Sequence, residues 1–326
     1  MAGYPPSIAR AVEVSRRHFP AGTGAMEAAL PVLLGPLLPV SDSARWRLSL
    51  LTDGGFPFEM TFSTAGDGPR YTMEVGPGGT PPGARLARSL ELLAELGSTP
   101  ADDATRGHLA RWQATGGLRF GAWLGARHGA AGSAYKVYAE VPAAARADAT
   151  AYLCSRLDGP LSLPGRRQEV QMVGWYPCSG EVEVYSRVYD LRPWELGPLM
   201  SPVGLDALAP AVLAIFEDVY GRPFAQRLPG PLFGYSYGLP APGSGCGAAF
   251  SFFSFCEALA GDDASTRRRL CGHWQRQGAC MDYYAEMSGP TAAHPGPWNH
   301  HGLLGVTVTA GAAPVTHIGL RPPEAA

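Results

Sequence analysis

Apolar and polar positions alternate in short segments that come in pairs, and an amphipathic segment follows most of the pairs. Alternation indicates a half-buried strand, whereas apolar residues three and four apart indicate a helix. The predicted strand pairs are 56–63 with 70–75, 118–127 with 134–141, 168–176 with 181–189, 232–239 with 247–255, and 303–309 with 314–320. Helices are predicted over 84–96, 143–156, 194–220 with proline interruptions, and 263–276, and the first residues predict a short amphipathic helix.

Short loops join the two strands of each pair, which predicts five antiparallel hairpins. Ten such strands with helices on one face close most readily into a barrel, because closure leaves no open strand edge. We therefore expect an α+β fold, a single ten-stranded antiparallel β-barrel built from five ββα repeats and surrounded by helices. Ten strands enclose more space than side chains fill, so a ligand chamber is expected inside. One domain would span 1–326, with a helical segment over 1–50 packed on the barrel.

Composition excludes several other classes of protein. Hydrophobic residues make up 46% of the chain and charged residues 17%, which predicts an ordered core. The net charge of −2 gives no electrostatic basis for binding nucleic acid or an anionic membrane. No apolar run could span a bilayer, and the N-terminus lacks the apolar region of a signal peptide. The six cysteines form no C-x-x-C pair, so we expect buried free thiols in a cytoplasmic monomer.

No metal site is expected. The histidines His294, His300 and His301 lie with Asn299 in a loop rich in Pro and Gly, without repeated ligand spacing. This pattern is more typical of a solvated loop.

Lys136 is the only lysine among the 26 Lys and Arg residues. A compact ammonium suits a narrow anion site better than a planar guanidinium does. The competing interpretation is a solvated charge on a strand edge. Side chains two apart share a face of a strand, so Lys136 and Tyr138 are expected to point the same way.

Each predicted hairpin carries polar or aromatic side chains on one face, and cations alternate with tyrosines on several strands. Lys, Arg and phenol hydroxyls together suit a diphosphate, while aromatic faces stabilise a carbocation. Such a set could bind a prenyl diphosphate, help it ionise and shield the allyl cation from water. Taken singly, each arginine is more typical of the surface and each tyrosine of strand packing. The residues are Glu59, Arg70, Lys136, Tyr138, Glu183, Tyr185, Arg187, Tyr189, Tyr235, Tyr237, His317 and Arg321.

An ordered set of segments resembles the aromatic prenyltransferases with the αββα, or ABBA, barrel. The nearest resemblance is to the branches that act on indoles and on cyanobactin peptides. The segments are FPFE at 56–59, RYT at 70–72, YKVY at 135–138, MVGWY at 172–176 and VEVYSRVY at 182–189.

The resemblance implies transfer of a prenyl group, most simply dimethylallyl from dimethylallyl diphosphate, to an aromatic or indole acceptor. That acceptor would be a tryptophan-like small molecule or a peptide side chain, in natural product biosynthesis. Glu59 matches the glutamate that hydrogen-bonds the acceptor and helps to remove its proton. The implied diphosphate ligands are Arg70, Lys136, Arg187, Tyr138, His317 and Arg321. The implied cation shield is Tyr138, Tyr185 and Tyr189, extended by Tyr235 and Tyr237.

One feature departs from the family pattern and a second agrees with it. The strand at 251–255 offers phenylalanines and serines where relatives often place Lys and Tyr. The family lacks the aspartate-rich motif of isoprenyl synthases, and here too neither Asp102-Asp103 nor Asp262-Asp263 is followed by the required third Asp. No cofactor is therefore expected to be required, with Mg²⁺ at most a stimulant.

A serine hydrolase is the sharpest alternative. The segment from Gly234 through Ser236 to Gly238 matches the G-x-S-x-G nucleophile elbow, and Asp262 or Asp263 and then His273 follow in the matching order. Prolines on both sides prevent a helix from starting directly after the segment, which argues against an elbow. A non-catalytic barrel that binds a small molecule is the remaining alternative.

Overall fold

The computed structural model describes residues 4–35, 49–77, 79–98, 103–157, 163, 165–230, 232–241, 243–244, 247–293 and 299–324. Asp102 and His294, named above, and Cys246, one of the six cysteines, lie outside this part of the chain.

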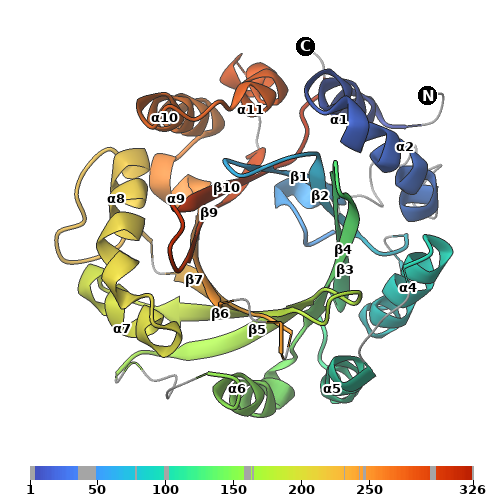
Figure 1. Ribbon diagram of the computed structural model, residues 1–326, viewed down its shortest axis with the longest axis horizontal. Coiled ribbons are helices and arrows are strands. Elements are labelled where there is room, and N and C mark those ends of the chain that lie inside the picture. The colour runs from blue at the N-terminus through green and yellow to red at the C-terminus, as the bar shows by residue number, and fades with distance from the viewer. Residues whose placement is uncertain are drawn as a thin grey trace.

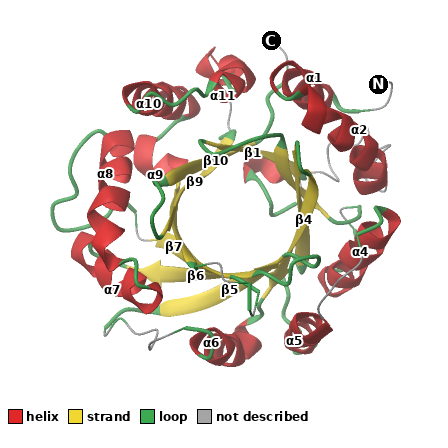
Figure 2. Cartoon of the chain, viewed as in Figure 1, coloured by secondary structure: helices red, strands yellow, loops and turns green. Residues whose placement is uncertain are grey.

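Ten antiparallel strands close into one barrel (Figures 1 and 2). Neighbours in the chain are neighbours in the barrel, and β1 pairs with β10 to close it. The predicted fold class and all five hairpins are therefore confirmed. The strands are β1 Phe58–Ser63, β2 Arg70–Glu74, β3 Ala122–Gly129, β4 Gly132–Glu140, β5 Gln168–Trp175, β6 Val182–Tyr189, β7 Leu232–Leu239, β8 Ala249–Phe255, β9 His301–Thr309 and β10 Val315–Leu320.

Helices ring the outside of the barrel (Figure 1). They are α1 Pro6–His18, α2 Pro20–Leu34, α4 Pro82–Glu95, α5 Asp103–Gln113, α6 Arg146–Cys154, α7 Leu196–Met200, α8 Ala209–Tyr220, α9 Cys256–Ala260, α10 Asp263–Arg276 and α11 Asp282–Met287. The N-terminal helix α2 packs on β3 and β4. Between α7 and α8 the chain forms short 3₁₀ turns, as the prolines in this segment predicted. Within the described residues, we find no helix with the length and apolar character needed to cross a bilayer.

Side chains on the two faces of the barrel wall differ in burial. On β1, the side chains of Phe58, Met60 and Phe62 are at most 1% exposed, whereas the alternate residues such as Glu59 are partly exposed. Because helices cover the outside, the fully buried set points outward into the core and the alternate set points into the lumen. The same alternation holds along β6. The interior is therefore polar and reached by solvent.

The cysteines differ in part from the expectation of buried thiols. None of the five in the described part of the chain forms a disulfide bond, but Cys178 and Cys280 are exposed and only Cys256 is fully buried. The two exposed thiols lie in the β5–β6 turn and in the connection after α10, where no helix or strand covers them.

Candidate functional site

Lys136 points into the lumen of the barrel. It pairs in register with Gly125, which stands on the same face as Thr72 and Glu59. Its ammonium donates to a carboxylate oxygen of Glu183 and, at 2.9 Å, to the hydroxyl of Tyr185. Only 5% of the residue is exposed.

Three tyrosine rings surround the same ammonium. Its Nζ lies 4.8 Å from the ring centroid of Tyr138, 4.9 Å from that of Tyr176 and 5.1 Å from that of Tyr185. Aromatic faces attract cations through the ring quadrupole. This part of the lumen is thus built to surround positive charge.

The Lys136–Glu183 pair is ionised on both sides. Burial lowers the pKa of Lys136, but the attraction of Glu183 and the nearby phenols outweighs it and holds the pKa well above the usual value. Burial likewise raises the pKa of Glu183, yet Lys136 and the hydroxyl of Ser236 hold it below the usual value. Ser236 donates to the second carboxylate oxygen, so Glu183 bridges β4 and β7.

Gly174 on β5 makes room for the lysine, since a Cβ there would overlap the Cε of Lys136 and approach the Tyr185 ring to 3.2 Å. We expect Gly174→Ala to lower the free energy of unfolding by about 2 kcal/mol, because it displaces the ammonium from Glu183 without removing it. Urea unfolding measures this. Gly107→Ala, where a Cβ meets nothing within 4 Å, is the matched control and should be neutral or slightly stabilising. Equal effects of the two substitutions would contradict the tight fit at Gly174.

Two other lumen cations have no such carboxylate. The Nε of Arg70 is buried without a hydrogen-bond partner, and burial together with the nearby Arg127 lowers the pKa of Arg70. Arg187 shares the inward face of β6 with Tyr185, and no ion pair to it occurs among the described residues. Unpartnered guanidinium groups are costly in a protein interior. The unsatisfied Nε of Arg70 points to an anionic ligand beside it.

Glu59 is another carboxyl group on the inward face of the barrel. It lies against Gly319 and Gly302, where a Cβ on Gly319 would be 2.6 Å from its Oε1 and one on Gly302 would also overlap it. Burial raises the pKa of Glu59 to about 8, and none of the described residues hydrogen-bonds it. The carboxyl group is thus free to meet a ligand and holds a proton at neutral pH.

The two basic residues predicted on the closing strand differ from expectation. His317 lies near Arg70, and burial followed by that positive neighbour lowers the pKa of His317 to about 4, so the imidazole is neutral at pH 7. Arg321 follows the end of β10, with its guanidinium 5.0 Å from the ring centroid of Phe56 at the rim. The structure does not bring Arg321 into contact with Lys136.

The aromatic lining is also only partly as predicted. The rings of Tyr138 and Tyr185 lie 5.9 Å apart in the lumen, and Phe253 of β8 lies 6.0 Å from Tyr185. Tyr189 lies farther along β6, with the guanidinium of Arg167 4.7 Å from its ring centroid. Phe253 and Tyr176 had no predicted role, and only the closed barrel shows that both stand on the inward face.

Tyr235 and Tyr237 do not line the lumen, which corrects their predicted role in the cation shield. Both are completely buried. The hydroxyl of Tyr237 donates to the Leu199 carbonyl of α7, outside the barrel. The register pairs Ser236 with Tyr185, so Ser236 takes the inward position on β7 and the two tyrosines point outward.

The hydrolase alternative is wrong for this fold. The segment 234–238 lies within the extended strand β7 and forms no strand-to-helix elbow. His273 is bound to Asp218 at 2.6 Å and Asp263 to His301 at 2.6 Å, both around α10 outside the barrel. Among the described residues, no histidine hydrogen-bonds Ser236, whose hydroxyl donates to Glu183.

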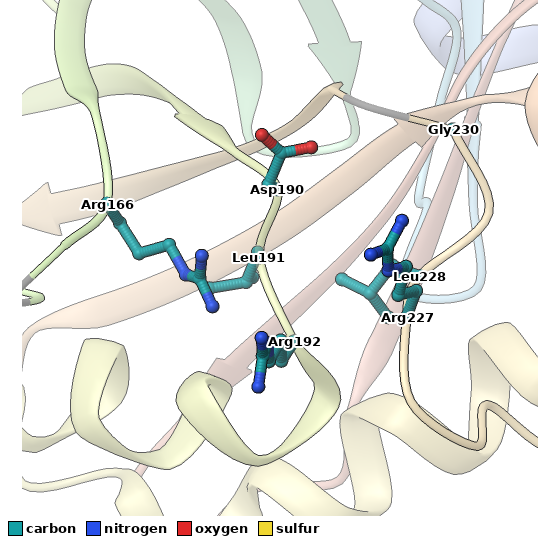
Figure 3. Close-up of a pocket in the computed structure, with 7 residues that line it drawn as sticks. All are labelled: Arg166, Asp190, Leu191, Arg192, Arg227, Leu228 and Gly230. Atoms are coloured by element: carbon teal, nitrogen blue, oxygen red, sulfur yellow. The ribbon is translucent and has the colours of Figure 1, made fainter.

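A separate pocket of about 530 Å³ lies where the chain enters β5, leaves β6 and approaches β7 (Figure 3). Two of its three arginines are engaged, since Arg166 pairs with Glu195 at 2.8 Å and Arg192 lies 5.3 Å from the ring of Trp194. None of the lumen residues described above lines it, so we place the candidate site in the lumen. The pocket is lined by Arg166, Asp190, Leu191, Arg192, Arg227, Leu228 and Gly230.

No protein-family model and no curated protein matches the sequence. Solved structures do match the fold. A 6-dimethylallyl tryptophan synthase has a TM-score of 0.73 at 17% identity, over 98% of this chain and 97% of that chain. A 6-dimethylallyltryptophan synthase from Micromonospora olivasterospora, in complex with DMASPP and Trp, has a TM-score of 0.73 at 18% identity, over 97% and 95%. The 5-dimethylallyl tryptophan synthase from Streptomyces coelicolor, in complex with the same two ligands, has a TM-score of 0.72 at 17% identity, over 99% of this chain and 99% of that chain. The chain thus has the ten-stranded αββα barrel fold of these aromatic prenyltransferases.

Proposed function

We propose that the protein is an aromatic prenyltransferase that transfers a dimethylallyl group from dimethylallyl diphosphate to an indole or a related aromatic acceptor. The observation that carries this proposal is the lumen itself. Arg70, whose Nε has no hydrogen-bond partner, lies in it together with tyrosine faces and a proton-holding carboxyl group. The tryptophan present in complexes of two similar structures supports an indole acceptor.

In the proposed first step, the bond between the allylic carbon and oxygen breaks and its electron pair leaves with the diphosphate. Arg70, Arg187 and Lys136 supply the positive charge that stabilises this leaving group. The tyrosine faces of Tyr138 and Tyr185 stabilise the allyl cation and keep water away from it. No side chain needs to form a covalent bond to the prenyl group.

In the second step, the acceptor ring attacks the allyl cation, and a bond forms between the prenyl carbon and the ring. The ring then loses a proton and regains aromaticity. In this proposal, Glu59 hydrogen-bonds the acceptor and, once ionised, takes this proton. Because Gly302 and Gly319 carry no Cβ, the carboxyl group has room beside them.

The decisive experiment incubates the protein and dimethylallyl diphosphate in EDTA with tryptophan, indole or a tryptophan-containing peptide. We expect a mass gain of one dimethylallyl unit on at least one acceptor, without added metal. A barrel that only binds ligands would retain diphosphate and acceptor yet form no product with any of them. That outcome would reject the enzymatic proposal, and the panel also separates a small-molecule acceptor from a peptide.

A further inference from the structure

Glu183 has no part in the reaction above, although it lies in the middle of the lumen. It points inward from β6, pairs with Lys136 and accepts a hydrogen bond from Ser236. A carboxylate repels a diphosphate, so its presence beside the cations of an anion site requires a physical explanation.

We propose that Glu183 is an internal counter-ion that competes with the diphosphate for Lys136 and so limits how tightly the diphosphate is held. This inference rests on the proposed function, because it requires a diphosphate in the lumen. It assigns Glu183 a positioning role that acts through the lysine.

The three lumen cations differ in what they must give up to bind an anion. Arg70 and Arg187 make no ion pair with a described carboxylate, so they can bind an anion without breaking one. Lys136 gives one hydrogen to Glu183 and one to Tyr185, which leaves a single donor free. A diphosphate can therefore engage the lysine fully only by loosening its contact with Glu183.

The packing around Lys136 limits how far its ammonium can move. Gly174 lies directly behind the Lys136 Cε, and the three tyrosine rings stand around the ammonium. The ammonium can shift between two anions but cannot move far from either. Exchange of one anion for the other is the motion that the packing permits.

When Lys136 exchanges Glu183 for the diphosphate, the charge around Glu183 also changes. The carboxylate keeps the Ser236 hydroxyl but loses its cation and gains an anionic neighbour, and both changes raise the pKa of Glu183. The phenols of Tyr138 and Tyr185 are already protonated near pH 7 and cannot take up a proton, whereas the neutral imidazole of His317 can. Only proton uptake that Glu183→Gln abolishes is therefore assigned to Glu183. Diphosphate binding should then be accompanied by proton uptake at Glu183. The titratable groups that face it are Lys136, Tyr138, Tyr185 and His317.

The test is calorimetric titration of inorganic diphosphate at pH 7.5 in buffers of different ionisation enthalpy. We expect wild type to take up protons on binding. Glu183→Gln should bind diphosphate at least about tenfold more tightly, equivalent to one pKa unit of interaction, and without proton uptake. Glu181→Gln is the matched control, because this neighbouring carboxylate has no ion pair among the described residues and should leave binding unchanged.

Each other outcome decides the question. Unchanged or weaker binding by folded Glu183→Gln overturns the inference, and so does wild-type binding without proton uptake, which needs no variant to measure. If Mg²⁺ tightens wild-type binding and Glu183→Gln abolishes that effect, Glu183 is a metal ligand instead. If wild type binds no diphosphate, the proposed function fails as well, whereas normal wild-type binding with an unaffected variant rejects the counter-ion alone.

Discussion

Glu59→Gln is expected to lower the rate of prenyl transfer by about 10²–10³-fold while the affinity for inorganic diphosphate stays unchanged. The glutamine keeps the shape of the side chain and can still hydrogen-bond an acceptor, but it cannot take a proton. Steady-state rates with saturating acceptor, together with calorimetric titration of diphosphate, measure the two quantities separately. Equal losses in rate and in diphosphate affinity would contradict a role for Glu59 on the acceptor.

The pH dependence of the same residue provides an independent check. Because the pKa of Glu59 is about 8, the wild-type rate should rise between pH 7 and pH 9 as the carboxylate forms, and the Gln variant should lack this rise. Stability should change in the opposite direction. An unfolded chain releases the proton near the ordinary carboxyl pKa of 4.5, whereas the folded protein holds it to about 8, so Glu59 lowers stability as pH rises from 4.5 to about 8. Unfolding of Glu59→Gln should depend less on pH there.

Arg70→Gln is expected to weaken diphosphate binding by about tenfold to a hundredfold and, at the same time, to raise the melting temperature. The binding loss follows from the removal of a charged hydrogen-bond donor. The gain in stability follows because the substitution removes a buried charge whose Nε has no partner. Thermal unfolding without ligand and titration with inorganic diphosphate measure the two effects.

Arg127→Gln is the matched control for Arg70. This second arginine lies on the neighbouring strand but is exposed and pairs with Asp67 at 3.1 Å. It should change diphosphate affinity far less and should not raise the melting temperature. If Arg70→Gln is destabilised like an ordinary core substitution, Arg70 has a structural partner and is not held for an anion.

The charges of the lumen fit the first step of the proposed reaction. At neutral pH, the Lys136–Glu183 pair adds no net charge, and Glu59 and His317 are neutral. Glu169 lies opposite Arg187 in the register but is paired with Arg146 and Arg167, so Arg70 and Arg187 make the lumen positive. This excess charge favours an anionic ligand, and the inward tyrosine rings stabilise a cation formed beside it.

Much of the fold could be predicted because the patterns that indicate strands, turns and helices involve residues close together in the sequence. Strand alternation and short turns lie within a few residues of each other, and five repetitions of one unit imply closure. The helix α5 was not predicted, because only Leu109 and Trp112 anchor it in the core and so little amphipathic spacing is visible. Weak local patterns become helices when a larger surface is available to pack against.

By itself, the sequence determined the hairpins, their order and the faces on which Lys136, Tyr138 and Tyr185 stand, because a strand's side-chain period depends only on neighbouring residues. Only the tertiary structure decided which face of β7 turns inward. In a closed barrel with a helical coat both faces of a strand are enclosed, so the aromatic pair Tyr235 and Tyr237 could have stood on either. The partnership of Lys136 with Glu183, 47 residues away, likewise depends on barrel register and on packing that no local pattern encodes.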